Sequence, residues 1–392
     1  MIKEKVLQSV ELLREFGVDC WITFTRESGI NGDPCLPFLA PGELTWHSAF
    51  IISADGRRKA IVGRWDAQAI EETGAYDEVT GFVTSFKEPF QAYLKALNPA
   101  RIAVNYSTSS EVCDGLTHGL YLTLVELLSA IGMADRLVSA EQIVSALRER
   151  KSAAEIARTR EAVRVTEEIF ALVRPVIQPG TTERAIAAFI LAEMERRKSQ
   201  TAWGQATCPS VFSGPDTAEA HYAPTGRTVK PGHLLNIDFG VRSDGYCSDL
   251  QRTYYLLRDG EATPPESICK ALAAVTSALE SARHAMKPGA QGIEVDTAAR
   301  KAITRAGFEE FPHAVGHQVG RFVHDGNASL GPAWEKYGRR PFQRLEENMV
   351  FAVEPRVTVP GHGIVTIEEM VLVTRHGAEW ISTPQKELLL VR

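Results

Sequence analysis

The sequence has few cysteines, and none of them is spaced to bind a metal or to form a disulfide framework. Its six cysteines are scattered through 392 residues without a CxxC pair, which is typical of thiols in a reducing compartment. Long apolar runs are also absent: no stretch approaches the about 20 residues that span a bilayer. The amphipathic N-terminal segment lacks the apolar core of a signal peptide. We therefore expect a cytoplasmic protein with no membrane partner.

Clusters of basic residues are absent as well. No run of lysine and arginine is interleaved with aromatic residues, and the net charge is −6, so we exclude a nucleic-acid partner. The composition, 44% hydrophobic and 23% charged, is that of a soluble globular protein rather than a disordered one. A chain of this length is too long for one ordinary core, which predicts two domains.

The first domain is predicted to be an α/β unit over residues 1–148. It contains no cluster of catalytic residue types. Ser152 and Glu155 have the spacing of a capping box that begins a long helix, so the second domain is expected over 149–392. The first domain's predicted helices lie at 3–16, 65–73 and 121–131, and its predicted strands at 18–24, 49–52, 58–62 and 101–104, with an irregular segment at 25–46.

Two pairs of carboxylates follow apolar strands in the second domain. Asp238 precedes Asp249 by eleven residues and Glu354 precedes Glu368 by fourteen, and each pair brackets a turn signal, at 243–245 and 360–363. Folded as hairpins, the first pair lies opposite or one diagonal step apart, and the second lies opposite. Like charges so placed destabilise a sheet, and burial adds a desolvation cost. The two pairs therefore predict a cation, most simply a metal.

The second domain also shows an internal repeat. Predicted helices at 152–176 and 182–198 precede the strand that carries Asp238, and helices at 266–286 and 293–306 precede the strand that carries Glu354. The pattern indicates two related α+β halves, each supplying one acidic pair.

Histidines cluster between the acidic pairs. His313, His317 and His324 fall within twelve residues and are separated by glycines that permit close backbone approach. His221 precedes the strand of Asp238. A single histidine of this kind is usually structural, but the clustering beside the carboxylate pairs favours a functional role.

These motifs together resemble those of the pita-bread metallopeptidases, the group of Xaa-Pro dipeptidase (prolidase), aminopeptidase P, methionine aminopeptidase and creatinase. The similarity extends over about residues 150–392, and the preceding segment is similar in size to the N-terminal domain of prolidases and creatinases. It implies a creatinase/prolidase-type α/β domain at 1–148 and a pita-bread catalytic domain with internal duplication at 149–392. The matching motifs are AHY at 220–222, NIDFG at 236–240, HxxGHxxGxxxH at 313–324, VEP at 353–355 and IEE at 367–369.

The resemblance implies two divalent metal ions per chain, with Asp249 and Glu368 bridging them. Glu369 is expected to face the other side of its strand and is not counted as a ligand. A set of four carboxylates and one imidazole suits Mn²⁺ best, with Zn²⁺ or Co²⁺ as alternatives. The implied ligands are Asp238, Asp249, His317, Glu354 and Glu368.

The implied activity is hydrolysis of Xaa-Pro dipeptides by a hydroxide that bridges the metals. Glu354 is expected to act as general base, and His221 to donate a hydrogen bond to the oxyanion. His313 and His324 would position the prolyl residue, and Arg356 is a further candidate for binding substrate. The expected partners are proline-containing dipeptides or short peptides and a second copy of the chain in a homodimer.

Three other functions remain open. Aminopeptidase P would take longer peptides, and a creatinase-like hydrolase or a non-catalytic pita-bread binding module would not need the complete metal set. The chain also departs from the family in having Thr358 and Thr366 where these proteases usually carry Tyr and Arg. On an extended strand Arg356 shares a face with Glu354, so it is expected to bring a permanent positive charge near the site.

Overall fold

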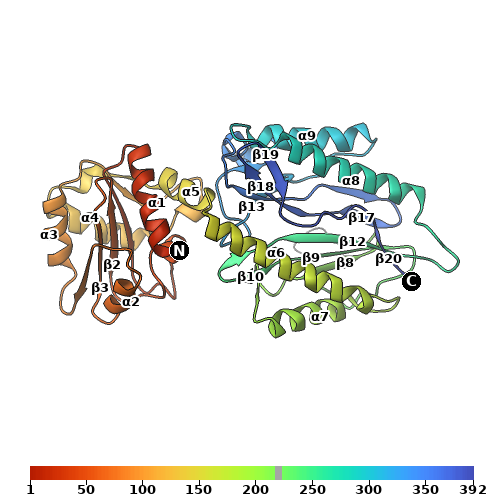
Figure 1. Ribbon diagram of the computed structural model, residues 1–392, viewed down its shortest axis with the longest axis horizontal. Coiled ribbons are helices and arrows are strands. Elements are labelled where there is room, and N and C mark those ends of the chain that lie inside the picture. Colours follow the sequence, from red (N-terminus) through yellow and green to blue (C-terminus); the bar gives the residue numbers. More distant parts are fainter. Residues whose placement is uncertain (217–222) are drawn as a thin grey trace. The chain divides into compact units, whose positions relative to one another are not determined.

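The computed structural model describes residues 1–216 and 223–392, and these residues form two compact units, Met1–Arg148 and Glu149–Arg392. Each unit has its own β-strands and helices (Figure 1) and its own hydrophobic cores. Among the described residues, no helix is both long enough and apolar enough to cross a membrane.

The N-terminal unit is built on a mixed six-stranded sheet with the order β4-β3-β2-β1-β5-β6. The central strand β1 runs antiparallel to β2 and parallel to β5. Alternate residues of β1 enter opposite cores, as the pleat requires: Trp21 lies in one and Ile22 in the other. The strands are β1 (Cys20–Thr25), β2 (Ser48–Ser53), β3 (Arg58–Gly63), β4 (Glu78–Phe82), β5 (Ile102–Val104) and β6 (Leu137–Ser139).

Helices cover both faces of this sheet. Side chains of α1 (Ile2–Glu15), α2 (Ala67–Glu72) and α5 (Glu141–Glu149) pack in the core that contains Trp21, whereas those of α3 (Lys87–Leu97) and α4 (His118–Ser129) pack in the other. The sequence analysis did not identify α3, α5 or β4. The long segment between β1 and β2 is irregular, as predicted, apart from one short 3-10 turn.

The C-terminal unit places its strands between two pairs of helices (Figure 1). One core joins α6 (Ala153–Val173) and α7 (Glu183–Arg196) to the strands, and a second core joins α8 (Glu266–Ala285) and α9 (Gly292–Arg305) to them. Strand β15 (Val350–Val353) supplies alternate residues to both cores, since Ala352 enters the first and Phe351 the second. The central strands are therefore covered on both faces.

The repeat predicted from the sequence is visible in the order of elements. The first helix pair is followed by a sheet of order β20-β12-β9-β8, and the second by a sheet of order β14-β13-β15-β18-β19. Besides β15, the strands of both sheets are β8 (Ser210–Ser213), β9 (Leu234–Phe239), β12 (Leu250–Leu256), β13 (Gly316–Gln318), β14 (Ser329–Leu330), β18 (Glu369–Thr374), β19 (Gly377–Trp380) and β20 (Leu389–Val391).

Helix α6 begins at the predicted capping box. The Ser152 hydroxyl accepts a hydrogen bond from the Glu155 amide, and the Ser152 amide donates to the Glu155 carboxylate at 2.8 Å. The helix ends at Val173, three residues earlier than predicted, and a 3-10 turn over Arg174–Val176 follows. Pro175 accounts for this end, because it has no amide proton and its ring clashes with the preceding helical turn.

Candidate metal centre

Five side chains reach one place in the C-terminal unit from the ends of its strands. Asp238 lies within β9 and Asp249 immediately precedes β12. His317 is the middle residue of the short strand β13. Glu354 follows β15 directly, and Glu368 lies between β17 (Gly363–Thr366) and β18.

The register of the strands accounts for the spacing of the first acidic pair. In the hairpin of β9 and β12, Asp238 is opposite Gln251. Asp249 is therefore one diagonal step from Asp238, which is one of the two arrangements expected from the sequence. Diagonal neighbours lie roughly 7–8 Å apart at Cα, close enough for long side chains to interact.

The second pair lies where one ladder ends and another begins. Val353 pairs with Glu369 between β15 and β18, and Arg356 pairs with Thr366 between β16 (Arg356–Val359) and β17. The register is the same on both sides of the interruption, so Glu354 is opposite Glu368, as expected. Pro355 lies in the interruption, where a residue without an amide proton is tolerated.

His317 faces three carboxylates at once. Its Nε2 atom lies 3.6 Å from Asp249 Oδ2, 3.7 Å from Glu354 Oε1 and 3.8 Å from Glu368 Oε1. Its Nδ1 atom lies 3.1 Å from the Val323 carbonyl oxygen. With the Nδ1 proton donated to that carbonyl, the lone pair of Nε2 faces the carboxylates, which is the tautomer that a metal-binding histidine needs.

Burial and mutual repulsion disfavour the charged forms of the carboxylates. Burial, followed by the charges of Asp238 and Glu354, raises the pKa of Asp249 well above its ordinary value. Burial also raises the pKa of Glu368 well above its ordinary value, with Asp249 next in effect. The pKa of Asp238 is raised by burial to about 7, and that of Glu354 to about 8 by burial and by Asp238. The cluster therefore favours a positive charge among these groups.

The donors fit a divalent metal. One ligand atom from each of Asp249, His317 and Glu368 lies within 4.8 Å of the others. The Oδ1 atom of Asp238 is buried and accepts no hydrogen bond from the described residues, 1–216 and 223–392, an unfavourable state that a cation would relieve. Carboxylate oxygens with one imidazole suit Mn²⁺ and similar ions, whereas the set contains no thiolate.

The other predicted site residues have different surroundings. His221 lies outside the described residues. The exposed His324 ring packs edge-to-face on His317 with 4.3 Å between centroids. His313 is partly buried, and its Nδ1 lies 2.8 Å from the Ala314 carbonyl oxygen. Burial, and then the charge of Arg356, lowers its pKa to about 4, so its ring is neutral at pH 7.

Arg356 and the two threonines can also be placed. Arg356 is partly buried, and its charge lowers the pKa of both Glu354 and His313. Thr358 shares its side of β16 but is exposed. Thr366 is buried, and its hydroxyl donates to Gln251 Oε1 at 2.6 Å.

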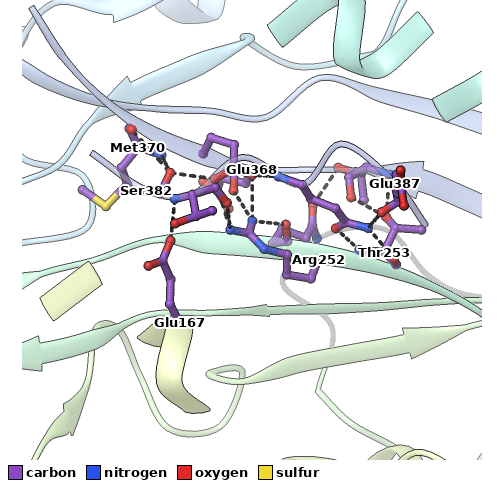
Figure 2. A network of polar contacts seen from close by, with 12 residues as sticks. Glu167, Arg252, Thr253, Glu368, Met370, Ser382 and Glu387 are labelled. Atoms are coloured by element: carbon purple, nitrogen blue, oxygen red, sulfur yellow. Dashed lines mark hydrogen bonds and ion pairs between the residues drawn. The ribbon is translucent and has the colours of Figure 1, made fainter. Parts of the chain in front are cut away.

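A buried polar network beside the site was not identified from the sequence (Figure 2). It centres on Arg252 and Glu369, whose side chains are 7% and 0% exposed and 3.0 Å apart. The sequence predicts only that Glu369 faces the side of its strand away from the metal ligands. The feature of the sequence that indicates this ion pair is Arg252 itself, because an arginine in a buried strand such as β12 requires an acidic partner.

The chain is similar to known proteins along most of its length. The model of metallopeptidase family M24 matches residues 157–375. The Xaa-Pro dipeptidase of Lactobacillus helveticus is 31% identical over 255 residues, which cover 63% of this chain and 64% of that protein.

Two solved structures are similar to this chain over nearly its whole length. The Xaa-Pro dipeptidase of Bacillus anthracis has a TM-score of 0.77 at 23% identity, with both chains covered completely. The X-Pro aminopeptidase of Thermotoga maritima has a TM-score of 0.76 at 25% identity, covering 97% of this chain and all of that one. The predicted fold class, an α/β N-terminal domain and an α+β pita-bread domain with internal duplication, is confirmed.

Proposed function

The chain belongs to metallopeptidase family M24, and from this premise we propose that it hydrolyses the peptide bond before a prolyl residue, with Xaa-Pro dipeptides as its preferred substrates. The observation that carries the proposal is the convergence of Asp249, Glu354 and Glu368 on one nitrogen of His317. The names of the Lactobacillus helveticus and Bacillus anthracis relatives support the choice of substrate.

We propose that two divalent ions, Mn²⁺ by preference, occupy this centre. Asp249 and Glu368 would be shared between the ions, since both are buried and both lie near His317. Asp238, whose Oδ1 has no hydrogen-bond partner in the part of the chain that the structure describes, and Glu354 would complete the set with His317. When bound, such a pair of ions supplies Lewis-acid chemistry, lowering the pKa of a water molecule towards neutrality and polarising the scissile carbonyl.

The protein's own groups would handle the protons and hold the substrate. Glu354 would accept a proton from the attacking water at a carboxylate oxygen and deliver it to the nitrogen of the departing prolyl residue. His324 would contact the prolyl ring from its position on His317, and His313 would line the same site as a neutral ring. We keep His221 as the proposed donor to the oxyanion and Arg356 as a proposed substrate contact.

Aminopeptidase P activity is the second candidate. It is favoured by the similarity of the complete chain to the X-Pro aminopeptidase of Thermotoga maritima. The two functions differ in the length of peptide accepted beyond the prolyl residue, so the length of the best substrate distinguishes them.

A panel of dipeptides and tripeptides, with and without proline at the second position, tests the proposal in the presence of Mn²⁺. We expect turnover of Xaa-Pro dipeptides, little turnover without proline, and about two bound ions per chain by elemental analysis. Tripeptides cleaved as fast as dipeptides would favour aminopeptidase P instead. A reconstituted protein without bound metal would contradict both.

A variant pair from one hairpin sharpens this test. Asp249→Asn should abolish turnover, and residue 249 should no longer bind both ions, because an amide NH₂ group replaces one of the two carboxylate oxygens. Asp244→Asn is the matched control, since Asp244 is exposed in the turn of the same hairpin, and it should retain wild-type turnover.

The homodimer, the cytoplasmic location and the domain limits 1–148 and 149–392 also remain proposals. Light scattering on the purified protein tests the first of them, with a mass of about twice the 43.1 kDa of one chain expected.

A further inference from the structure

We infer that the buried pair Arg252–Glu369 is a positioning element that holds Asp249 and Glu368 at the separation needed to share two metal ions. The inference rests on the proposed metal centre. It assigns a role to two residues that would touch neither the ions nor the substrate.

Glu369 is completely buried, and its carboxylate is held by an ion pair and by further hydrogen bonds. Arg252 holds it in a two-point pair, with Nη1–Oε1 at 3.0 Å and Nη2–Oε2 at 3.1 Å. The Ser382 hydroxyl donates to Oε2 at 2.6 Å, and the Gln385 amide donates to Oε1 at 2.7 Å. The orientation of this carboxylate is therefore set from two separate segments of the chain, β12 and the stretch that contains Ser382 and Gln385.

Arg252 uses its remaining donors on main-chain carbonyl groups. Nη1 donates to the carbonyl oxygens of Gln251 and Glu368, each at 3.0 Å, and Nη2 donates to that of Thr383 at 3.1 Å. The carbonyl of Glu368 belongs to one of the proposed shared ligands. The Arg252 guanidinium thus holds the main-chain carbonyl of Glu368 and also the side chain of the next residue, Glu369.

The same pair connects the two halves of the C-terminal unit. Arg252 lies on β12, three residues after Asp249, and Glu369 begins β18, immediately after Glu368. Between these positions the two sheets meet in a single antiparallel bridge, in which the amides of Gln251 and Glu368 donate to one another's carbonyl groups at 3.3 and 3.2 Å. Hydrogen bonds between Thr253 Oγ1 and the main chain of Thr366, and from Asn236 Nδ2 to the Ile364 carbonyl oxygen, add to this bridge on the side of β17. The Arg252–Glu369 pair lies on the side of β18.

A two-point ion pair adds a constraint on the side of β18. Arginine and a carboxylate meet in a fixed plane, so the pair sets the angle between β12 and β18 as well as their distance. Asp249 and Glu368 extend from these two strands to the same centre. A small rotation between the strands would move their oxygens apart and would weaken an ion held by both.

Metal binding by variants of the pair tests this inference. Glu369→Gln, Arg252→Met and the double variant are compared with wild type for Mn²⁺ stoichiometry and affinity by calorimetry, and for the absorption spectrum of the Co²⁺-loaded protein. Partners that orient metal ligands are typically worth 10–100-fold in metal affinity, and we expect a loss of that order for the weaker ion, with an altered Co²⁺ spectrum. The double variant should lose little more than either single one, because the pair acts as a unit.

Two further variants keep the test decisive. Glu193→Gln is the matched control, since Glu193 on α7 is also a buried glutamate paired with an arginine, with its Oε2 2.6 Å from Nη1 of Arg197, which follows the helix. This variant should bind both ions normally. Ser382→Ala removes one donor to Glu369 without leaving a charge unpaired, and a few-fold loss of affinity is expected even where Glu369→Gln does not fold.

The outcomes separate this inference from the proposed function. Wild-type affinity and spectrum in Glu369→Gln and Ser382→Ala, with only a lower melting temperature, would show that the pair is merely structural. A wild-type protein that binds no Mn²⁺ would instead overturn the proposed metal centre, and the inference with it.

Discussion

His317 and Arg356 show how single residues set the electrostatics of this site. Nε2 of His317 faces three carboxylates and has a free lone pair because the ring proton is on Nδ1, which lies next to the Val323 carbonyl oxygen. Arg356 is the nearby permanent cation whose charge lowers the pKa of both Glu354 and His313. It stands opposite Thr366 in the β16–β17 hairpin, and the family usually has its own arginine at the position of Thr366.

Replacing Arg356 tests its role in turnover. Arg356→Ala should lower kcat/KM on an Xaa-Pro dipeptide by roughly 10-fold or more, since a hydrogen bond to a charged group is worth about 1.5–3 kcal/mol. Thr358→Ala is the control, because Thr358 lies on the same side of β16 but is exposed, and it should change the rate little. Wild-type turnover by metal-loaded Arg356→Ala would show that this arginine does not contact substrate.

Strand β13 is the element on which the position of His317 depends. It lies between β14 and β15, and its first residue, Gly316, pairs with Val353. A Cβ atom on Gly316 would overlap the carbonyl oxygen of Ala352 in the neighbouring strand. The glycine therefore permits the close approach of β13 and β15 that brings His317 to Glu354.

Gly316→Ala should accordingly push β13 away from β15. We expect a loss of about 1–3 kcal/mol in the free energy of unfolding, as for other overpacked sites, together with weaker metal binding by His317. Chemical denaturation and metal calorimetry measure the two effects. Gly204→Ala is the control, because a Cβ there meets nothing within 4 Å, and its metal affinity should match the wild type.

The hairpins show how far the sequence could predict such elements. The distance from Glu354 to Glu368, with turn residues between them, was sufficient to predict the register of the second hairpin, whereas that from Asp238 to Asp249 left two arrangements, because a two-residue period leaves few alternatives. The partner of Arg252 could not be predicted in the same way. Glu369, Ser382 and Gln385 lie far along the chain, and only the folded strands bring them together. Helices α3 and α5 were not predicted from the sequence.

At the scale of the whole molecule, the acidic pairs of the two halves repel one another unless a cation is present. In the metal-free protein the raised pKa values of Asp238, about 7, and Glu354, about 8, exceed those of the unfolded chain, about 4. The folded state therefore binds more protons between these values. The stability contributed by these groups is complete below about pH 4 and is lost as the pH rises through 7 and 8.

The melting temperature of the metal-free protein should consequently fall between about pH 5 and about pH 8. One pKa unit corresponds to roughly 1.4 kcal/mol, and each kcal/mol shifts the melting temperature of a domain of this size by about 2–4 °C, so the raised pKa values of the two groups together predict a decrease of about 10 °C or more. Added Mn²⁺ should reverse the trend, because its ligands must be deprotonated. Calorimetric scans with and without chelator measure both, and an unchanged melting temperature across this range would contradict the raised pKa values.

The division of the site between two halves also affects how the protein is made. Asp238 and Asp249 are synthesised well before Glu354 and Glu368, with all of α8 and α9 between them. Domains fold as the ribosome releases them, from the N-terminal side onwards, so the first half emerges with only one acidic pair and half of a metal centre. A nascent chain therefore cannot degrade peptides. Activity begins only when the segment that carries Glu354 and Glu368 has been released and Glu368 has paired with Gln251 of β12.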